Sequence, residues 1–430
     1  MQQSVSLASP VARVLYWRRL LFWLAVCALF ALLPTLFTQS FALSMLSQMG
    51  IAIIFALSYN MLLGQTGLLS FGHAVYFGLG AFFTAHAINW VDAGRIWFPI
   101  TFMPLAGGLA GLAFGLIFGF VTTRRAGTPF AMISLGIAEM VAASALMFTT
   151  FFGGEGGIGT NRTAGGEVIG VSYGPQIEVY YLIAGWCVVC MIAMFALTQT
   201  PLGRMANAVR DNPERAMFVG YNPTRVRWLM LSLSAGFAGI AGGLSAINYE
   251  IVTAETLGVM ASGSVVLMAF IGGIGHFWGP ILGAILVTFL QSALSTYTQA
   301  WLLYFGLFFL VIIMFSPGGI ANLITMHKPA WQAGMLKRLL PPYALAAASG
   351  AVMMTGFIAL IEMIYHYEAK EAATRAFGVF GIGFDPGGAG SWLVTLVLLL
   401  VGIALFWWTS RFVRRAWDAI TPELQARGAV

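Results

Sequence analysis

Residues 43–63 read LSMLSQMGIAIIFALSYNMLL, a run without a single charged side chain. An α-helix needs about 20 mainly apolar residues to cross the hydrocarbon core of a bilayer. Because this run has that length, it predicts a membrane-spanning helix. The whole chain has the same character, since 59% of its 430 residues are hydrophobic and 8% are charged, against roughly a quarter charged in soluble domains. The composition excludes a soluble protein.

The chain contains about twelve apolar runs of spanning character, so it predicts an all-α fold, a polytopic transmembrane helical bundle with about ten core spans and two C-terminal spans. The run at 261–275 is short and broken by glycine, so it is either a full span or a re-entrant half-helix. We divide the chain into a membrane domain, 1–325, and a C-terminal extension with two spans, 326–430. The runs are 20–37, 43–63, 74–90, 98–122, 128–152, 178–198, 228–248, 261–275, 279–297, 301–316, 342–363 and 391–410.

The charged residues predict an orientation. If the spans alternate from a cytoplasmic N-terminus, most of the 21 Lys and Arg residues fall in cytoplasmic segments, whereas acidic residues such as Asp92, Glu155 and Glu250 fall outside. This pattern obeys the positive-inside rule. We therefore expect a multi-pass protein of the bacterial inner membrane with both termini in the cytoplasm. The net charge of +6 does not indicate a nucleic-acid partner, because the basic residues do not gather on one soluble face.

Small residues recur at every fourth position in three places: Gly107 to Gly119, Ala235 to Gly243, and Gly275 to Gly283. Such stripes let membrane helices approach closely. Helix packing is therefore the favoured interpretation, ahead of a direct contact with solute.

The segment 200–227 is long and charged for a connection between spans, yet it carries helix signals. Asn212 is suited to cap a helix that begins at Pro213, and Gly220 is suited to end it in a left-handed conformation. Asn222 and Pro223 repeat the start signal for the next span. These residues predict a short surface helix held by tight turns at both ends. It is either a connector that satisfies the positive-inside rule or a docking element.

Several polar residues lie within or beside the apolar runs. Glu139 is in the middle of the run 128–152, where a charge costs about 2.5 to 3.5 kcal/mol on insertion scales, so we expect it to face the bundle interior or a water-filled path. The alternative is a paired or protonated structural carboxyl. Asn60, Gln65 and His73 border a glycine-bearing break and are weaker candidates for the path. Glu362 ends a span and is expected to snorkel toward the interface.

The segment 200–224 and three further motifs carry a family resemblance. The motifs are NMLLGQTGLLSFGH at 60–73, GTPFAM at 127–132 and GGIGHFWGP at 272–280. Together they resemble the permease family of branched-chain amino acid ABC importers over residues 45–322, in order and with similar spacing. The resemblance implies that 1–325 is an importer permease domain. It also implies a second homologous permease subunit, two cytoplasmic ATP-binding subunits and a periplasmic solute-binding protein.

The resemblance further implies that the loop 200–227 couples this chain to an ATPase. We expect polar contacts from its charged residues, while its aromatic and methionine side chains fill a groove, because aromatic anchors usually dominate docking. The predicted coupling residues are Arg204, Arg210, Asp211, Asn212, Glu214, Arg215, Met217, Phe218, Gly220 and Tyr221.

The chain has no motif for catalysis or for binding a nucleotide. A P-loop requires Gly-Lys before Ser or Thr, and none of the three lysines follows a glycine. No zinc-protease motif or nucleophile elbow is present. We therefore expect no enzyme activity, no metal and no cofactor on this chain, and ATP on the partner ATPase subunits.

Two other function classes remain open. A stand-alone secondary transporter or channel, for a small polar solute such as urea or an amide, would place paired ionisable residues in mid-membrane. Glu139 alone is clearly placed so, which argues against it. A structural membrane scaffold would need neither a solute path nor an ATPase. For the importer, the resemblance favours branched-chain or related amino acids, and it leaves the extension 326–430 unexplained.

Overall fold

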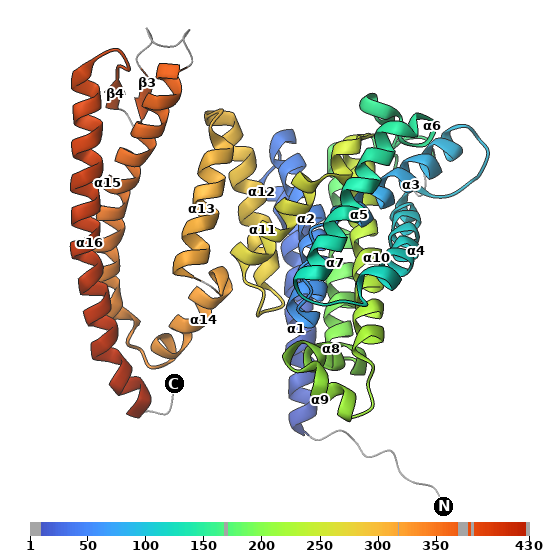
Figure 1. Cartoon of the computed structure of the whole chain (residues 1–430), viewed down its shortest axis with the longest axis horizontal. Coiled ribbons are helices and arrows are strands. Elements are labelled where there is room, and N and C mark those ends of the chain that lie inside the picture. The colour runs from blue at the N-terminus through green and yellow to red at the C-terminus, as the bar shows by residue number, and fades with distance from the viewer. Residues whose placement is uncertain (1–9, 167–170, 317, 369–376, 380–381, 427–430) are drawn as a thin grey trace, which may run out of the picture. The chain divides into compact units, whose positions relative to one another are not determined.

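The structure is a computed structural model that describes residues 10–166, 171–316, 318–368, 377–379 and 382–426 (Figure 1). The chain separates into two compact units. Unit 1 comprises residues 1–294 and 308–321, and unit 2 comprises residues 295–307 and 322–430. We describe each unit by itself.

Every apolar run predicted from the sequence is largely helical, which confirms the polytopic helical fold. Nine helices of the described part are long and apolar enough to span a membrane, or ten if the bent pair α13 and α14 is one span. Helix α11 and the described apolar part of α1, Leu20–Leu36, are shorter. The main helices are α1 (Pro10–Leu36), α2 (Ser40–Thr66), α3 (Ala74–Asp92), α4 (Pro104–Thr122), α5 (Thr128–Met147), α7 (Gln176–Gln199), α10 (Pro223–Tyr249), α11 (Val259–Gly272), α12 (Gly279–Tyr297), α13 (Trp301–Phe315), α14 (Gly319–Gln332), α15 (Leu336–Glu368) and α16 (Ala389–Ala426).

Helix α10 lies at the centre of unit 1 and packs against α2, α3 and α4. The contact with α4 joins two of the predicted small-residue stripes. A Cβ atom on Gly239 would overlap the carbonyl oxygen of Gly107, and one on Gly111 would overlap that of Ala235. The stripes therefore serve close helix packing, as predicted, because any side chain would push the two backbones apart.

A second close approach joins α11 to α12 through the turn between them. A Cβ on Gly283 would overlap the carbonyl of Met268, and one on Gly279 would overlap that of Gly273. The prediction was wrong for Gly275, whose added Cβ would meet open space, because this residue lies in the turn itself. Gly272 takes its place in the contact.

The two ends of unit 1 carry different charges. Helices α4 and α10 run antiparallel, since Gly107 adjoins Gly239 while Gly119 adjoins Trp228. Arg124 and Arg125, just beyond α4, therefore lie at the end of the unit that carries α8 (Pro201–Asp211) and α9 (Pro213–Phe218). In Figure 1 these two short helices lie at the bottom of unit 1.

The opposite end of unit 1 is built from short elements. Strands β1 (Ile158–Gly159) and β2 (Ile251–Val252) pair antiparallel there, with Ile158 opposite Val252. Beside them, the carboxylate of Glu250 accepts a hydrogen bond from the backbone N–H of Arg162 at 3.1 Å. The remaining short elements are α6 (Thr149–Phe152) and the 3₁₀ turns η1 (Ile100–Phe102), η2 (Gly154–Gly156) and η3 (Ala254–Leu257).

Unit 2 contains the helix pair α15 and α16. Gly402 approaches the backbone of Met353, and Ser349 Oγ lies 2.7 Å from Thr409 Oγ1, so the two helices touch along their length. Strands β3 (Phe377–Val379) and β4 (Ile382–Phe384), which lie between the two helices in the sequence, pair antiparallel with Gly378 opposite Gly383.

The expectation that Glu362 snorkels was wrong. Its side chain, in α15, is 12% exposed and accepts hydrogen bonds from Thr298 Oγ1 at 2.8 Å and from Tyr304 Oη at 3.0 Å. These two hydrogen-bond donors keep the carboxylate inside unit 2. A carboxylate without such partners would instead extend toward water.

Candidate functional site

The predicted coupling loop folds into two short helices rather than one. The first, α8, was not predicted. Thr200 caps it, with Oγ1 accepting a hydrogen bond from the N–H of Gly203 at 3.3 Å, and Pro201 occupies its first turn. A cap followed by proline is a recognisable start signal, so the pair Thr200–Pro201 could have revealed this helix.

The second helix, α9, is the one that the sequence predicted. Asn212 Oδ1 accepts a hydrogen bond from the N–H of Arg215 at 2.9 Å, and Gly220 takes a positive φ of 91° just after the helix ends. Asn222 Oδ1 then accepts from the N–H groups of Thr224 at 3.0 Å and Arg225 at 3.3 Å. Both caps are confirmed. The segment therefore has a fixed shape, because each turn is held by a side-chain oxygen.

Helix α9 presents an apolar tip to the outside of the chain. Phe218 is 91% exposed and Val219 is 76% exposed, and Met217 and Tyr221 are exposed beside them. We call these four residues the apolar tip. Val219 was missing from the predicted coupling residues. The charged candidates Arg204, Glu214 and Arg215 are exposed near it. Large apolar side chains with so little cover are typical of a surface that binds another protein.

Arg210 differs from the other coupling candidates because its side chain turns back onto the chain. Its Nη1 donates a hydrogen bond to the carbonyl oxygen of Gly64 near the end of α2, and its guanidinium pairs with Asp211 at 3.0 Å. A cation at this position is favourable, because the C-terminal end of a helix carries free carbonyl groups and partial negative charge. Arg210 thus connects the coupling segment to α2.

The end of α2 also holds two of the predicted path residues. Asn60 and Gln65 are 5% and 9% exposed, and their side-chain oxygens have no hydrogen-bond partner within the described part of the chain. Gly64 lies between them, close to the carbonyl of Ile274 in the turn between α11 and α12. Two motifs that are distant in sequence, 60–73 and 272–280, therefore meet here, next to Arg210.

His73, the third residue of that break, lies in the core of unit 1. It is fully buried, its Nε2 lies 3.0 Å from Ser58 Oγ, and the rings of Phe55, Tyr59 and Tyr76 surround it. This position favours a structural role, in which His73 fixes the start of α3 against α2. A direct contact with a moving solute would require the surrounding rings to separate.

Glu139 does not face the interior of this chain. It lies on α5 among exposed residues, while the neighbouring Ala138 and Val141 pack into a core cluster with Phe82. Since Thr128 begins α5, Glu139 lies about 16 Å along the helix, near its middle. The part of the prediction that placed it in this chain's interior was wrong, because the apolar face of α5 occupies that side.

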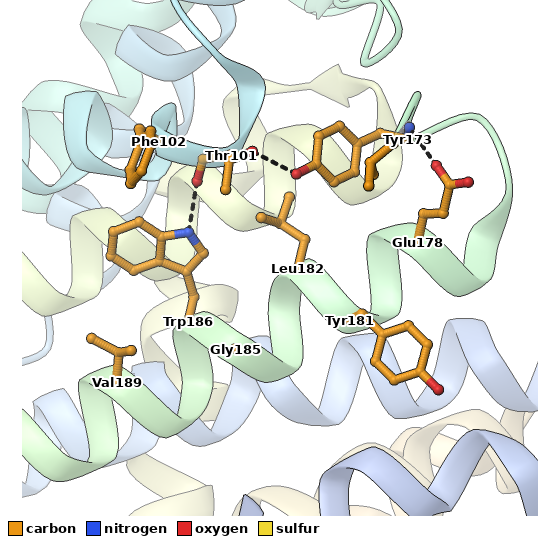
Figure 2. Close-up of a pocket in the computed structure, with 10 residues that line it drawn as sticks. Thr101, Phe102, Tyr173, Glu178, Tyr181, Leu182, Gly185, Trp186 and Val189 are labelled. Carbon is orange, nitrogen blue, oxygen red and sulfur yellow. Dashed lines mark hydrogen bonds between the residues drawn. The ribbon is translucent and has the colours of Figure 1, made fainter. Parts of the chain in front are cut away.

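A pocket of about 580 Å³ opens in unit 1 beside the first turns of α7 (Figure 2). Trp186 Nε1 donates to the Thr101 carbonyl at 2.8 Å, Thr101 Oγ1 lies 2.6 Å from Tyr173 Oη, and the Tyr173 N–H donates to Glu178 at 2.7 Å. As Figure 2 shows, these polar groups bind one another, while Phe102, Leu182 and Val189 line the wall. The pocket is mainly apolar, and no motif in the sequence pointed to it.

Comparison with known proteins identifies the family. The chain is 28% identical over 300 residues to the high-affinity branched-chain amino acid transport system permease protein LivM of Salmonella typhimurium, covering 65% of this chain and 69% of that protein. The corresponding LivM of Escherichia coli is 29% identical over the same shares. The fructose import permease protein FrcC of Rhizobium meliloti is 25% identical, covering 46% of this chain and 57% of that protein.

No solved structure matches the chain. The sequence model of one family, described as branched-chain amino acid transport system / permease component, matches residues 41–317. This segment contains α2 to α13, with the capped loop, the glycine contacts and the break at the end of α2. The chain therefore belongs to the permease component family of branched-chain amino acid transport systems.

Proposed function

We propose that this chain is the membrane-spanning subunit of an ATP-driven importer that translocates branched-chain or related amino acids. The substrate is supported by the LivM relatives, which are named for branched-chain amino acids, whereas FrcC is named for fructose. The same family suggests the assembly: a second homologous permease subunit, two cytoplasmic ATP-binding subunits and a periplasmic binding protein that delivers the solute.

The observation that carries the proposal is the apolar tip on α9. Caps at Asn212 and Asn222 fix the segment, and Phe218 stands almost fully exposed on it. A rigid segment with a projecting aromatic side chain suits insertion into a groove of another protein, because little conformational entropy is lost on binding. In our proposal the groove belongs to an ATP-binding subunit.

The charge distribution supports the orientation that this proposal requires. Arg124 and Arg125 lie at the same end of unit 1 as α8 and α9, and acidic residues such as Asp92, the last residue of α3, and Glu255 in η3 lie at the opposite end. By the positive-inside rule, the end with α8 and α9 faces the cytoplasm, where the ATPase is.

Energy from ATP reaches the permease only if the ATPase binds α8 and α9 with different affinity in its open and closed states, since a ligand shifts a conformational equilibrium only by differential binding. Arg210 connects the surface that the ATPase would contact to the interior of unit 1. It joins α8 to the end of α2, so a displacement of α8 acts on the segment that holds Asn60 and Gln65.

The proposal is tested by reconstituting the chain with its partner permease, the ATP-binding subunits and the binding protein in proteoliposomes. Uptake of radiolabelled leucine should require ATP on the ATPase side and solute-loaded binding protein on the other. Uptake that persists without ATP would instead indicate a stand-alone carrier or channel. Absence of leucine uptake, together with ATP-dependent uptake of a sugar, would overturn the assignment of substrate.

A further inference from the structure

Glu139 carries a carboxylate near the middle of α5. Its helix, α5, has two different faces. Ala138, Val141 and Ala145 are buried against α3 and neighbouring elements, whereas Glu139 and Met140 are exposed on the other side. Within the described part of the chain, no hydrogen bond or ion pair is found for the Glu139 carboxylate. The carboxylate near the middle of a spanning helix thus receives no compensating partner from the described residues of its own chain.

Lipid is an unsuitable neighbour for this face. A carboxylate in the centre of the bilayer is costly, so such residues face a bundle interior or a water-filled cavity. By contrast, the exposed face of α4 carries Leu109, Ile117 and Phe120, which are apolar and suited to lipid. Because Glu139 does not face the interior of its own chain, the polar space must lie between this chain and another component of the transporter.

The residues next to Glu139 on the exposed face of α5 are small or flexible. Gly136 lies one turn before it, and a Cβ added there would meet open space. Ala143 lies one turn after it and is exposed, with a side chain of a single carbon atom. Met132 and Met140 flank these positions with flexible apolar side chains. A carboxylate between two small residues, with apolar neighbours, matches an ammonium group carried next to an aliphatic side chain.

We propose that Glu139 binds the ammonium group of the amino acid as it passes between this chain and the second permease subunit. The inference rests on the proposed function and adds the recognition element: a charge-assisted hydrogen bond from the solute ammonium to the carboxylate. Met132 and Met140 then contact the aliphatic side chain, since methionine adapts to varied apolar shapes. A fructose molecule has no ammonium group, so this site distinguishes the two solute classes.

The first experiment compares Glu139→Gln with the native chain in the full reconstituted complex, using radiolabelled leucine. Uptake should fall about tenfold or more, because glutamine keeps the size but loses the charge. Glu139→Asp should retain uptake within about threefold of native. Copurification of all subunits should be unchanged. Glu155→Gln, an exposed carboxylate outside the spanning helices, is the matched control and should transport normally.

The second experiment measures access directly. Cys27 is replaced by serine to remove the exposed native thiol, and Cys187 and Cys190 remain because they are buried. Ala143→Cys in this background lies one exposed turn after Glu139 and keeps the carboxylate. It should react with a membrane-impermeant, positively charged thiol reagent, and leucine supplied with loaded binding protein and ATP should slow that reaction. Ile117→Cys, on the apolar face of α4, should react slowly with or without leucine.

Three results would overturn the inference while leaving the proposed function intact. Normal leucine uptake by Glu139→Gln would exclude a role in recognition. Loss of the second permease subunit during purification of Glu139→Gln would show that the carboxylate stabilises the subunit interface and does not recognise the solute. Labelling of Ala143→Cys that leucine does not alter would place this face of α5 away from the path. If the native complex itself showed no ATP-dependent uptake, the proposed function would fail instead.

Discussion

Arg210 on α8 donates a hydrogen bond to the carbonyl oxygen of Gly64 on α2, across 146 positions of sequence. The bond joins the surface segment with the apolar tip to the turn of α2 that contains Asn60 and Gln65. Next to it, Gly67 closes α2 with a φ of 69°, and the Cγ of Arg210 lies where a Cβ on Gly67 would come within 3.0 Å. The side chain of Arg210 thus fits a space that only glycine leaves open.

Replacing Arg210 by alanine should uncouple the transporter. Subunits should still copurify, because the apolar tip is intact, whereas stimulation of ATPase activity by loaded binding protein should fall several-fold. Arg225→Ala is the matched control, since Arg225 is exposed and only its backbone N–H takes part in a cap. If Arg210→Ala and Arg225→Ala retained equal, native stimulation, the link would have no part in coupling.

Gly67→Ala tests the same contact from the other side. A non-glycine residue in the left-handed conformation costs about 1 kcal/mol, and the added methyl would displace the Arg210 side chain. We expect a lower melting temperature of the purified chain and reduced ATPase stimulation. Gly166→Ala provides the control, because Gly166 also has a positive φ, 65°, but has open space around it. It should lower the melting temperature without affecting coupling.

Phe218→Ala should weaken docking of the ATPase without weakening the fold. The side chain is 91% exposed, so its loss should change the free energy of unfolding by less than about 0.5 kcal/mol. Docking through a buried aromatic anchor typically loses about 2 kcal/mol on truncation. The ratio of ATPase to permease after purification measures the effect. Phe148→Ala, an equally drastic change of an exposed residue beyond α5, should leave that ratio unchanged.

Gly239→Ala should destabilise unit 1 strongly. Its new Cβ would overlap the carbonyl oxygen of Gly107, and because both atoms belong to helix backbones, neither can move without separating α4 from α10. A loss of about 1 to 3 kcal/mol is expected for such overpacking. Thermal unfolding in detergent measures it. Gly263→Ala, in α11 with open space around it, should be neutral or slightly stabilising, by about 0.4 to 1 kcal/mol.

Asn212→Ala removes the cap of α9. Loss of an N-terminal cap costs about 1 kcal/mol, which is enough to fray a helix of six residues. Hydrogen exchange of the backbone between Pro213 and Phe218 should become faster, and ATPase binding should weaken because the apolar tip is no longer held. Asn212→Asp keeps the acceptor oxygen and should preserve both properties. Unchanged exchange in the alanine variant would contradict the role of the cap.

The sequence by itself determined the features that depend on local chemistry. Apolar runs of spanning length can form nothing but helices in a bilayer, because every backbone polar group must be paired. The start and end of α9 were readable because a cap, a proline and a glycine act within a few residues of one another. The glycine stripes could be recognised for the same reason, since residues spaced four apart lie on one face of a helix.

Only the tertiary structure decided which of these features meet. No local signal shows that Arg210 donates a hydrogen bond to Gly64, or that Glu362 accepts hydrogen bonds from Thr298 and Tyr304. Nor does any local signal show that the boundary between the two units falls within α13. The side of α5 on which the Glu139 side chain lies could not be predicted either, because a single charge in an apolar run does not show which face of the helix packs inward. These relationships depend on contacts between distant segments, and such contacts exist only once the helices have packed.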